Sequence, residues 1–274
     1  MPFDTTKKSC DPERLTCLLH YVFLKNFPTQ LYYIPNFITE EEELKLCEHI
    51  YAVPLPKWVV LSGRRLQNWG GIPHPKGMLA EKIPEWLHTY MDRVSNLGAF
   101  GDHKANHALI NEYKPGQGIT PHHDGPLYYP VVATINLGSY GVLDFYKPVK
   151  DVMNSAAGDK STNENLAQLA PYDSRYIGSA LLQPRSLNLV AGELYTHYMH
   201  GIDFYRSDRI YLPSMQKVQA QSDAHRACVV NWNNCGLEGG PPSDALVRGT
   251  RVSITIRCVP KISKLNVGLL LNKK

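Results

Sequence analysis

Residues 111–126 decide how this chain is interpreted, and they read Asn-Glu-Tyr-Lys-Pro-Gly-Gln-Gly-Ile-Thr-Pro-His-His-Asp-Gly-Pro. The pattern predicts a strand, a tight turn built by one proline and two glycines, and a returning segment that ends in His-His-Asp. Side chains alternate along an extended chain, so His122 and Asp124 share one face while His123 points to the other. The shared face therefore carries an imidazole and a carboxylate, which are two of the three ligands of a facial metal triad.

The third ligand has two candidates, His197 and His200. We expect residues 195–200 to form a strand, on which an offset of three places the two histidines on opposite faces. Only one of them can then face a metal. The alternative for His122 and Asp124 is a buried histidine that simply hydrogen-bonds a neighbouring carboxylate.

A second pattern lies near the end of the chain, in the β-branched run at residues 251–257. Its two arginines, Arg251 and Arg257, are six residues apart, so on a strand they share a face with Ser253 and Thr255. Burying two guanidinium groups is costly unless anions meet them. A dicarboxylate cosubstrate would meet them, whereas exposed salt bridges are the simpler alternative.

Taken together, these motifs resemble the AlkB-type Fe(II)/2-oxoglutarate dioxygenases. The resemblance rests on N-x-Y at Asn111 and Tyr113, on H-x-D, on a later histidine and on R-x5-R. Residues 64–71, 124–130 and 142–146 extend it. It spans about residue 31 to the C-terminus, apart from two loops.

The resemblance implies a site for Fe(II), 2-oxoglutarate and O2. His200 stands before Gly-Ile, as the third ligand of the family does, so the implied metal ligands are His122, Asp124 and His200. The implied cosubstrate contacts are Asn111, Tyr113, Arg251, Ser253 and Arg257. Arg251 would pair with the distal carboxylate of 2-oxoglutarate, and Arg257 would lie near its metal-side end. Ser253 stands where better-studied relatives often carry asparagine.

The family uses an N-terminal lid to hold a flipped, methylated base. The matching residues here are Arg64 and Arg65 as phosphate contacts and Trp69 as a stacking platform, with a core tryptophan as the alternative. Candidates for the pocket wall are Tyr128, Tyr129 and Asp144. Relatives that repair bases carry an acidic residue two positions after the aspartate ligand, where this chain has Pro126.

The implied reaction couples conversion of 2-oxoglutarate to succinate and CO2 with oxidation of an N-methyl group, which leaves as formaldehyde. We therefore expect oxidative demethylation of N-alkylated nucleic acid. Two alternatives stay open: a dioxygenase that acts on a protein or small molecule, and a binding module with little turnover. Turnover of methylated oligonucleotides and uncoupled conversion of 2-oxoglutarate would distinguish them.

Composition sets limits on compartment and partners. A formal charge of +4 is compatible with binding single-stranded nucleic acid but is no nucleic-acid signature by itself. The six cysteines show no disulfide spacing, so we expect a reducing compartment. His225, Cys228 and Cys235 lack a fourth zinc ligand, so we expect thiols in a loop there rather than a zinc site. No apolar run reaches about 18 residues, which predicts no membrane span. Cytoplasm and nucleus are the expected locations.

The 274 residues predict a single dioxygenase domain, mainly β with flanking helices (α+β), built on a double-stranded β-helix (jelly-roll) core. Helices and the lid are expected over about 30–105, and the core over about 106–205 and 247–259. Residues 148–178 and 206–246 read as surface insertions, the second as a mobile or partner-facing loop through which a protein could bind. Local signals predict a strand at 31–34, a helix opened by a capping box at 39–42, a hairpin over 58–69, and a second helix from Pro84 to Gly98.

Overall fold

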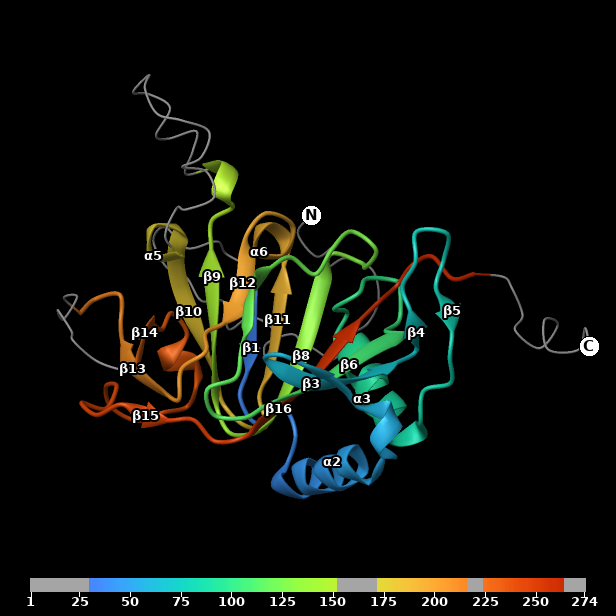
Figure 1. The fold of residues 1–274 in the computed structure, drawn as a ribbon, viewed down its shortest axis with the longest axis horizontal. Helices are drawn as coiled ribbons and strands as arrows, with labels where there is room; N and C mark the ends of the chain where they lie inside the picture. The colour runs from blue at the N-terminus through green and yellow to red at the C-terminus, as the bar shows by residue number, and fades with distance from the viewer. Residues whose placement is uncertain (1–29, 152–171, 216–223, 264–274) are drawn as a thin grey trace, which may run out of the picture.

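Two antiparallel sheets face each other in this computed structural model, which describes residues 30–151, 172–215 and 224–263 (Figure 1). The major sheet consists of β1 (Leu31–Ile34), β11 (Leu187–Ala191), β8 (Val131–Gly138), β16 (Arg251–Arg257), β6 (His107–Tyr113), β3 (Arg64–Trp69) and β2 (Val59–Leu61), in that order. The minor sheet consists of β10 (Tyr176–Leu182), β9 (Gly141–Tyr146), β12 (Met199–Ile202) and β7 (Ile119–His122). This arrangement confirms the predicted mainly-β, jelly-roll fold.

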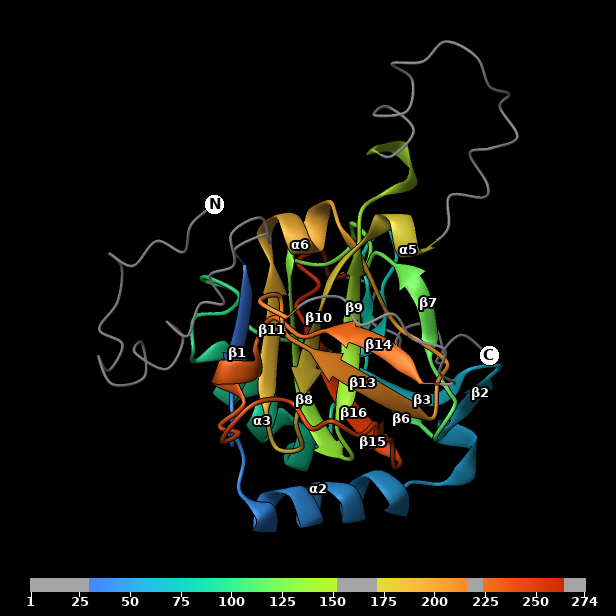
Figure 2. The same cartoon turned by 90° about the vertical axis from the view of Figure 1, so that its left-hand side faces the viewer.

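Two helices cover the outer face of the major sheet, α2 (Glu40–Ala52) and α3 (Glu85–Ser95) (Figures 1 and 2). The predicted capping box is present: Glu42 N donates to Thr39 Oγ1, and Thr39 N donates to the Glu42 carboxylate. At the end of α3, Gly98 adopts a positive φ of 79°, which a glycine tolerates without strain. A short two-stranded ribbon, β4 (Gly71–Ile72) and β5 (Leu79–Ala80), joins the lid hairpin to α3. The predicted strand at 31–34 and the hairpin β2–β3 are confirmed.

Strand alternation on β16 divides its side chains between two environments. Val252, Ile254 and Ile256 are buried under the helices, in the core that includes Leu46 and Met91. The predicted opposite face, with both arginines, Ser253 and Thr255, lines a pocket between the two sheets. One strand therefore contributes both to the core and to the pocket, because its period of two separates apolar from polar residues.

The prediction of a strand over residues 195–200 is wrong for the first half of that segment. Residues Gly192–Thr196 form the short helix α6, which His197 N extends by donating to Glu193 O at 2.9 Å. Gly192 has φ of 54°, and this left-handed residue turns the chain from β11 into the helix. Strand β12 begins only at Met199. Strand β10 begins at Tyr176, directly after the short helix α5 (Tyr172–Arg175).

The region 206–246 is not a simple surface loop. It supplies β13 (Ser207–Tyr211), β14 (His225–Cys228) and part of β15 (Leu246–Val247), which form a third sheet against β10. Trp232 and Val229 are buried in the core between this sheet and β10. The prediction failed because the strands are short and pair in parallel across an intervening segment, which gives no hairpin signal.

Residues 1–29, 216–223 and most of the insertion expected at 148–178 lie outside the described residues. The assignment of the whole chain to one domain stays a prediction. Among the helices of the described segments, none has the length and hydropathy needed to cross a bilayer.

Candidate active site

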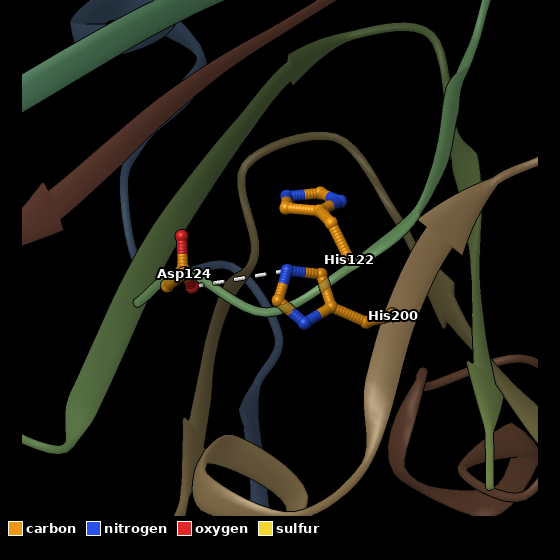
Figure 3. A group of neighbouring side chains, drawn as sticks. All are labelled: His122, Asp124 and His200. Atoms are coloured by element: carbon orange, nitrogen blue, oxygen red, sulfur yellow. Dashed lines mark ion pairs between the residues drawn. The ribbon is translucent and has the colours of Figure 1, made fainter. Parts of the chain in front are cut away.

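Three predicted metal ligands meet at one end of the pocket, where β7 and β12 run side by side (Figure 3). His122 ends β7 and lies directly opposite His200 on β12, while Asp124 lies in the loop that follows β7. The ligand atoms of the three residues all lie within 4.8 Å of one another. His200 Nε2 is 3.7 Å from Asp124 Oδ2. Antiparallel pairing thus brings together residues that are 78 positions apart, from 122 to 200.

The protonation state of the two histidines suits a metal. Burial lowers the pKa of His200 to about 4 and lowers the pKa of His122 as well, so both rings are neutral near pH 7. The Nδ1 atom of His122 lies 2.9 Å from Thr120 O, which leaves Nε2 to face the other ligands. Asp124 Oδ2 is buried without a hydrogen-bond partner among the described residues. Two neutral imidazoles and an unsatisfied carboxylate oxygen are a donor set that fits Fe(II).

Arg257 holds the aspartate in its charged form. Its Nη2 donates to Asp124 Oδ1 from the end of β16. Burial by itself would raise the pKa of Asp124, but the charge of Arg257 and the neighbouring His200 and His122 together lower it. The carboxylate is therefore ionised and fixed in orientation before any metal binds, as a ligating carboxylate requires.

Arg251 lies deeper in the pocket and is only 5% exposed. Its Nη2 donates to Asn136 Oδ1 at 2.6 Å, but Nε and Nη1 have no hydrogen-bond partner in the described part of the chain. Burial lowers the pKa of this guanidinium to about 10. A Cβ at position 141 would lie 2.6 Å from Arg251 Cδ, so Gly141 makes room for the side chain. A buried cation with two unmet N–H groups fits the distal carboxylate of 2-oxoglutarate.

Asn136 positions Arg251, and the sequence analysis missed it. Its Oδ1 accepts a hydrogen bond from the Arg251 guanidinium. Its Nδ2 donates to Asn188 Oδ1 at 3.0 Å and to Ser186 Oγ at 3.1 Å. All three polar residues are buried, two of them in the major sheet. A lone asparagine inside the apolar strand 131–138 was the available signal, because a buried amide must find partners.

The remaining cosubstrate candidates also line the pocket, next to Arg251 and the metal ligands. Asn111 and Tyr113 come from β6, and Ser253 lies opposite Asn111 on β16. The centre of the Arg251 guanidinium is 5.6 Å from the Tyr113 ring. The five predicted contacts thus converge on one cavity, although their individual roles stay predictions.

The lid arginines do not act as a pair. Arg64 lines the pocket, and its Nε donates to Asn111 Oδ1 at 3.0 Å. Arg65 points to the other face of β3, where Nε and Nη2 each lie 2.7 Å from the buried carboxylate of Glu112. Its guanidinium also stacks on Trp58 at 4.2 Å. Arg65 therefore has a structural partner, and neither arginine is placed as a simple phosphate contact.

Of the other substrate candidates, only Tyr128 lies beside the site, with Arg257 4.8 Å above its ring. Trp69 packs edge-on against Trp86 and joins the core under the helices. Tyr129 packs against Phe100 in the same core. Trp69 and Tyr129 are thus partly buried and pack against the core.

Asp144 is not in the pocket wall, which corrects its assignment as a substrate residue. Its neighbour Leu143 lines the pocket, so alternation on β9 turns Asp144 to the opposite face. There Ser179 Oγ donates to it at 2.5 Å, and His225 Nε2 lies 3.3 Å away. Burial raises the pKa of Asp144 to about 6.

Histidines outside the triad have other partners. His123 Nε2 lies 3.0 Å from the backbone oxygen of His197, and His197 Nε2 lies 2.7 Å from Asp151. Cys228 and Cys235 form no disulfide, and the triad is the only set of possible metal ligands in the described residues.

Comparison with known proteins places this geometry in a family. Residues 57–257 match the profile of the 2OG-Fe(II) oxygenase superfamily. The chain is 47% identical to the protein named "Probable RNA/DNA demethylase ALKBH6" of Danio rerio, over 94% of this chain and 97% of that protein. It is 26% identical to "Alkylated DNA repair protein ALKBH8 homolog" of Arabidopsis thaliana, over 66% of this chain and 52% of that protein.

A solved structure, "The structure of OsALKBH1", is similar with a TM-score of 0.48 and 9% identity, covering 86% of this chain and all of that one. The resemblance of residues 64–71, 124–130 and 142–146 is to the sixth AlkB homologue in particular, and the zebrafish relative confirms it. The chain therefore belongs to the 2OG-Fe(II) oxygenase superfamily and is a dioxygenase that depends on Fe(II) and 2-oxoglutarate.

Proposed function

We propose that this dioxygenase oxidatively demethylates N-alkylated nucleic acid. The observation that carries the proposal is the 47% identity, over 94% of the chain, to a protein named as a probable RNA/DNA demethylase. The pocket agrees with the negatively charged cosubstrate that the family requires. Three guanidinium groups, those of Arg64, Arg251 and Arg257, line it together with the single carboxylate of Asp124.

The contacts of each pocket residue indicate its role in the reaction. His122, Asp124 and His200 would hold Fe(II), Arg251 would bind the distal carboxylate of 2-oxoglutarate, and Arg257 keeps Asp124 ionised. When bound, the iron and 2-oxoglutarate activate O2 and supply the oxidation of a substrate C–H bond. The chain itself supplies orientation and a largely apolar enclosure, from residues such as Leu143 and Val190.

The decisive experiment measures turnover of matched single- and double-stranded oligonucleotides that each carry one N-methylated base, with the products identified by their mass. We expect loss of a methyl group, with formaldehyde and succinate formed in equal amounts, and no product from a His200→Ala variant. Conversion of 2-oxoglutarate to succinate with no oligonucleotide product would favour a protein or small-molecule substrate. No conversion at all would favour a binding module.

Binding to single-stranded nucleic acid is a separate test. We expect weak binding that depends little on base sequence. The logarithm of the association constant should fall with the logarithm of salt concentration, with a slope of about −0.7 per phosphate contact. Trp69 packs against Trp86, so Trp69→Ala should lower thermal stability and leave the salt slope unchanged. A loss of affinity of about 1–3 kcal/mol at unchanged stability would instead show that a base stacks on Trp69.

Location and protein partners belong to the same proposal. None of the four described cysteines forms a disulfide, which supports, together with the absence of disulfide spacing in the sequence, a reducing compartment such as the cytoplasm and nucleus. A protein partner would bind through the loops of the region 206–246.

A further inference from the structure

Arg64 has a contact that its predicted role does not explain. It opens β3 and lies beside β6, so that its side chain reaches the pocket and its Nε donates to Asn111 Oδ1 at 3.0 Å. The two residues are 47 positions apart. The Arg64 side chain is partly exposed, whereas Asn111 is only 5% exposed.

This contact fixes which way the amide of Asn111 faces. A guanidinium has only donors, so the amide oxygen must point toward Arg64 and the NH2 group must point away from it. The bond to Arg64 is the side-chain hydrogen bond that Asn111 makes within the described residues, and Asn111 lines the pocket. The pocket therefore receives two amide N–H donors from Asn111.

The orientation matters because the cosubstrate carries only acceptors. Both carboxylates and the 2-oxo group of 2-oxoglutarate accept hydrogen bonds, so an NH2 group attracts them while an amide oxygen repels them. An asparagine without a fixed partner can rotate about its terminal torsion and present either end. Holding the donor end in place removes that freedom before binding, which strengthens binding without adding a contact.

We propose that Arg64 is a positioning residue that locks the amide of Asn111 with its NH2 group toward 2-oxoglutarate. This role concerns the cosubstrate, so it does not depend on the identity of the methylated substrate. It also separates Arg64 from its neighbour Arg65, which faces the other side of β3 and pairs with Glu112.

The test is calorimetric titration of 2-oxoglutarate into the Mn(II)-loaded protein, which measures affinity without turnover. Arg64→Met should raise the Kd for 2-oxoglutarate by about tenfold, the size expected for one hydrogen bond of roughly 1.4 kcal/mol. Arg64→Lys keeps a donor for the amide oxygen and should stay within about threefold of wild type. Thermal melts should change little in both variants, because the side chain is partly exposed.

A double-mutant cycle separates positioning from direct contact. In an Asn111→Ala background, Arg64→Met should cost no further affinity, since no amide remains to be oriented. If the two losses simply add, Arg64 contacts 2-oxoglutarate itself and the proposal is wrong. An unchanged Kd in Arg64→Met also overturns it, and a raised KM for oligonucleotide in that variant would show a substrate contact instead.

Arg65→Gln is the matched control, because it removes one positive charge from the same strand on the opposite face. It should lower thermal stability, since the buried Glu112 loses its partner, and leave the Kd for 2-oxoglutarate unchanged. A raised Kd in this control would mean that the general charge of β3, and not the Asn111 contact, governs cosubstrate affinity.

Discussion

Two clusters of buried charge lie on opposite faces of the minor sheet, and they differ in how well their polar atoms are satisfied. In the pocket, Asp124 Oδ2, His200 Nδ1, Arg251 Nε and Nη1, and Arg257 Nε have no partner in the described chain. On the outer face, Asp144, Asp208, His225 and Arg248 form what we term the outer cluster. Residue types are similar in both, so composition alone cannot tell them apart.

The outer cluster is closed on itself. Arg248 binds both oxygens of Asp208 at 2.5 and 2.7 Å, and His225 Nδ1 lies 2.9 Å from Asp208 Oδ1. The phenol of Tyr140 also donates to Asp208, at 2.9 Å. Only Asp144 Oδ2 lacks an aligned hydrogen bond, although His225 Nε2 is 3.3 Å away, close enough for attraction between charges.

The difference indicates which cluster is a site. A network whose donors and acceptors satisfy one another stabilises the packing of the third sheet on β9 and β10. A cluster with several buried, unmet groups is stable only if something else meets them. The pocket cluster therefore binds its missing partners from outside, and four predictions test this contrast from the largest effect to the smallest.

The largest effect concerns the metal ligands. His122→Ala, Asp124→Ala and His200→Ala should each abolish conversion of 2-oxoglutarate to succinate, because each removes one of three ligands. His200→Ala should keep its thermal stability, since it removes a buried ring nitrogen, Nδ1, that has no partner among the described residues. His123→Ala and His197→Ala are the controls and should retain metal binding. If His197→Ala lost the metal and His200→Ala kept it, the third ligand would be wrongly assigned.

A substitution in the outer cluster should lower the stability of the protein. Asp208→Ala leaves Arg248 as an unpaired buried cation, which typically costs about 3–5 kcal/mol of unfolding free energy. Denaturant unfolding measures this loss. Lys45→Ala breaks an exposed ion pair with Glu41 and should unfold close to wild type. A small loss in Asp208→Ala would mean that the outer cluster contributes little to stability, and the contrast between the two clusters would fail.

Arg251→Lys is a conservative substitution in the pocket that tests the binding of 2-oxoglutarate. Lysine keeps the charge but loses the planar fork, so the affinity for 2-oxoglutarate should fall by about 1.5–3 kcal/mol, or roughly one to two decades. Titration of 2-oxoglutarate measures the change, with Arg209→Lys on the exposed side of β13 as the control. An affinity equal to wild type would remove Arg251 from the cosubstrate site.

The smallest expected effect is a pH dependence of the outer cluster. Burial by itself would lower the pKa of His225, but the hydrogen bond to Asp208 and the two carboxylate charges raise it above 6.5. A raised folded-state pKa gives stability that is fully present below about pH 6.5 and is lost as pH rises through the folded-state value. The melting temperatures of wild type and His225→Gln should therefore converge as the pH rises above about 6.5. A constant difference would contradict a charged His225.

Several features were correctly predicted because they depend on neighbouring residues only. Side chains alternate along any strand, so the spacing of Arg251 and Arg257 already placed both on one face of β16. His122 and Asp124 also meet as predicted, although Asp124 lies in the loop after β7. The capping box at Thr39 is likewise a contact over three residues. The choice of His200 over His197 came from the family resemblance, since residues 192–196 form a helix instead of the strand that the offset argument assumed.

The sequence by itself thus determined the strand faces, the order of the helices and strands in the first half, and the family to which the motifs belong. Only the tertiary structure decided which charged residues meet: Arg64 with Asn111, Arg251 with Asn136, and Asp144 with His225. These partners are 47, 115 and 81 positions apart, the last from 144 to 225. No local rule encodes such pairs, because a strand fixes only the direction of its side chains, while sheet pairing and packing decide what lies opposite them.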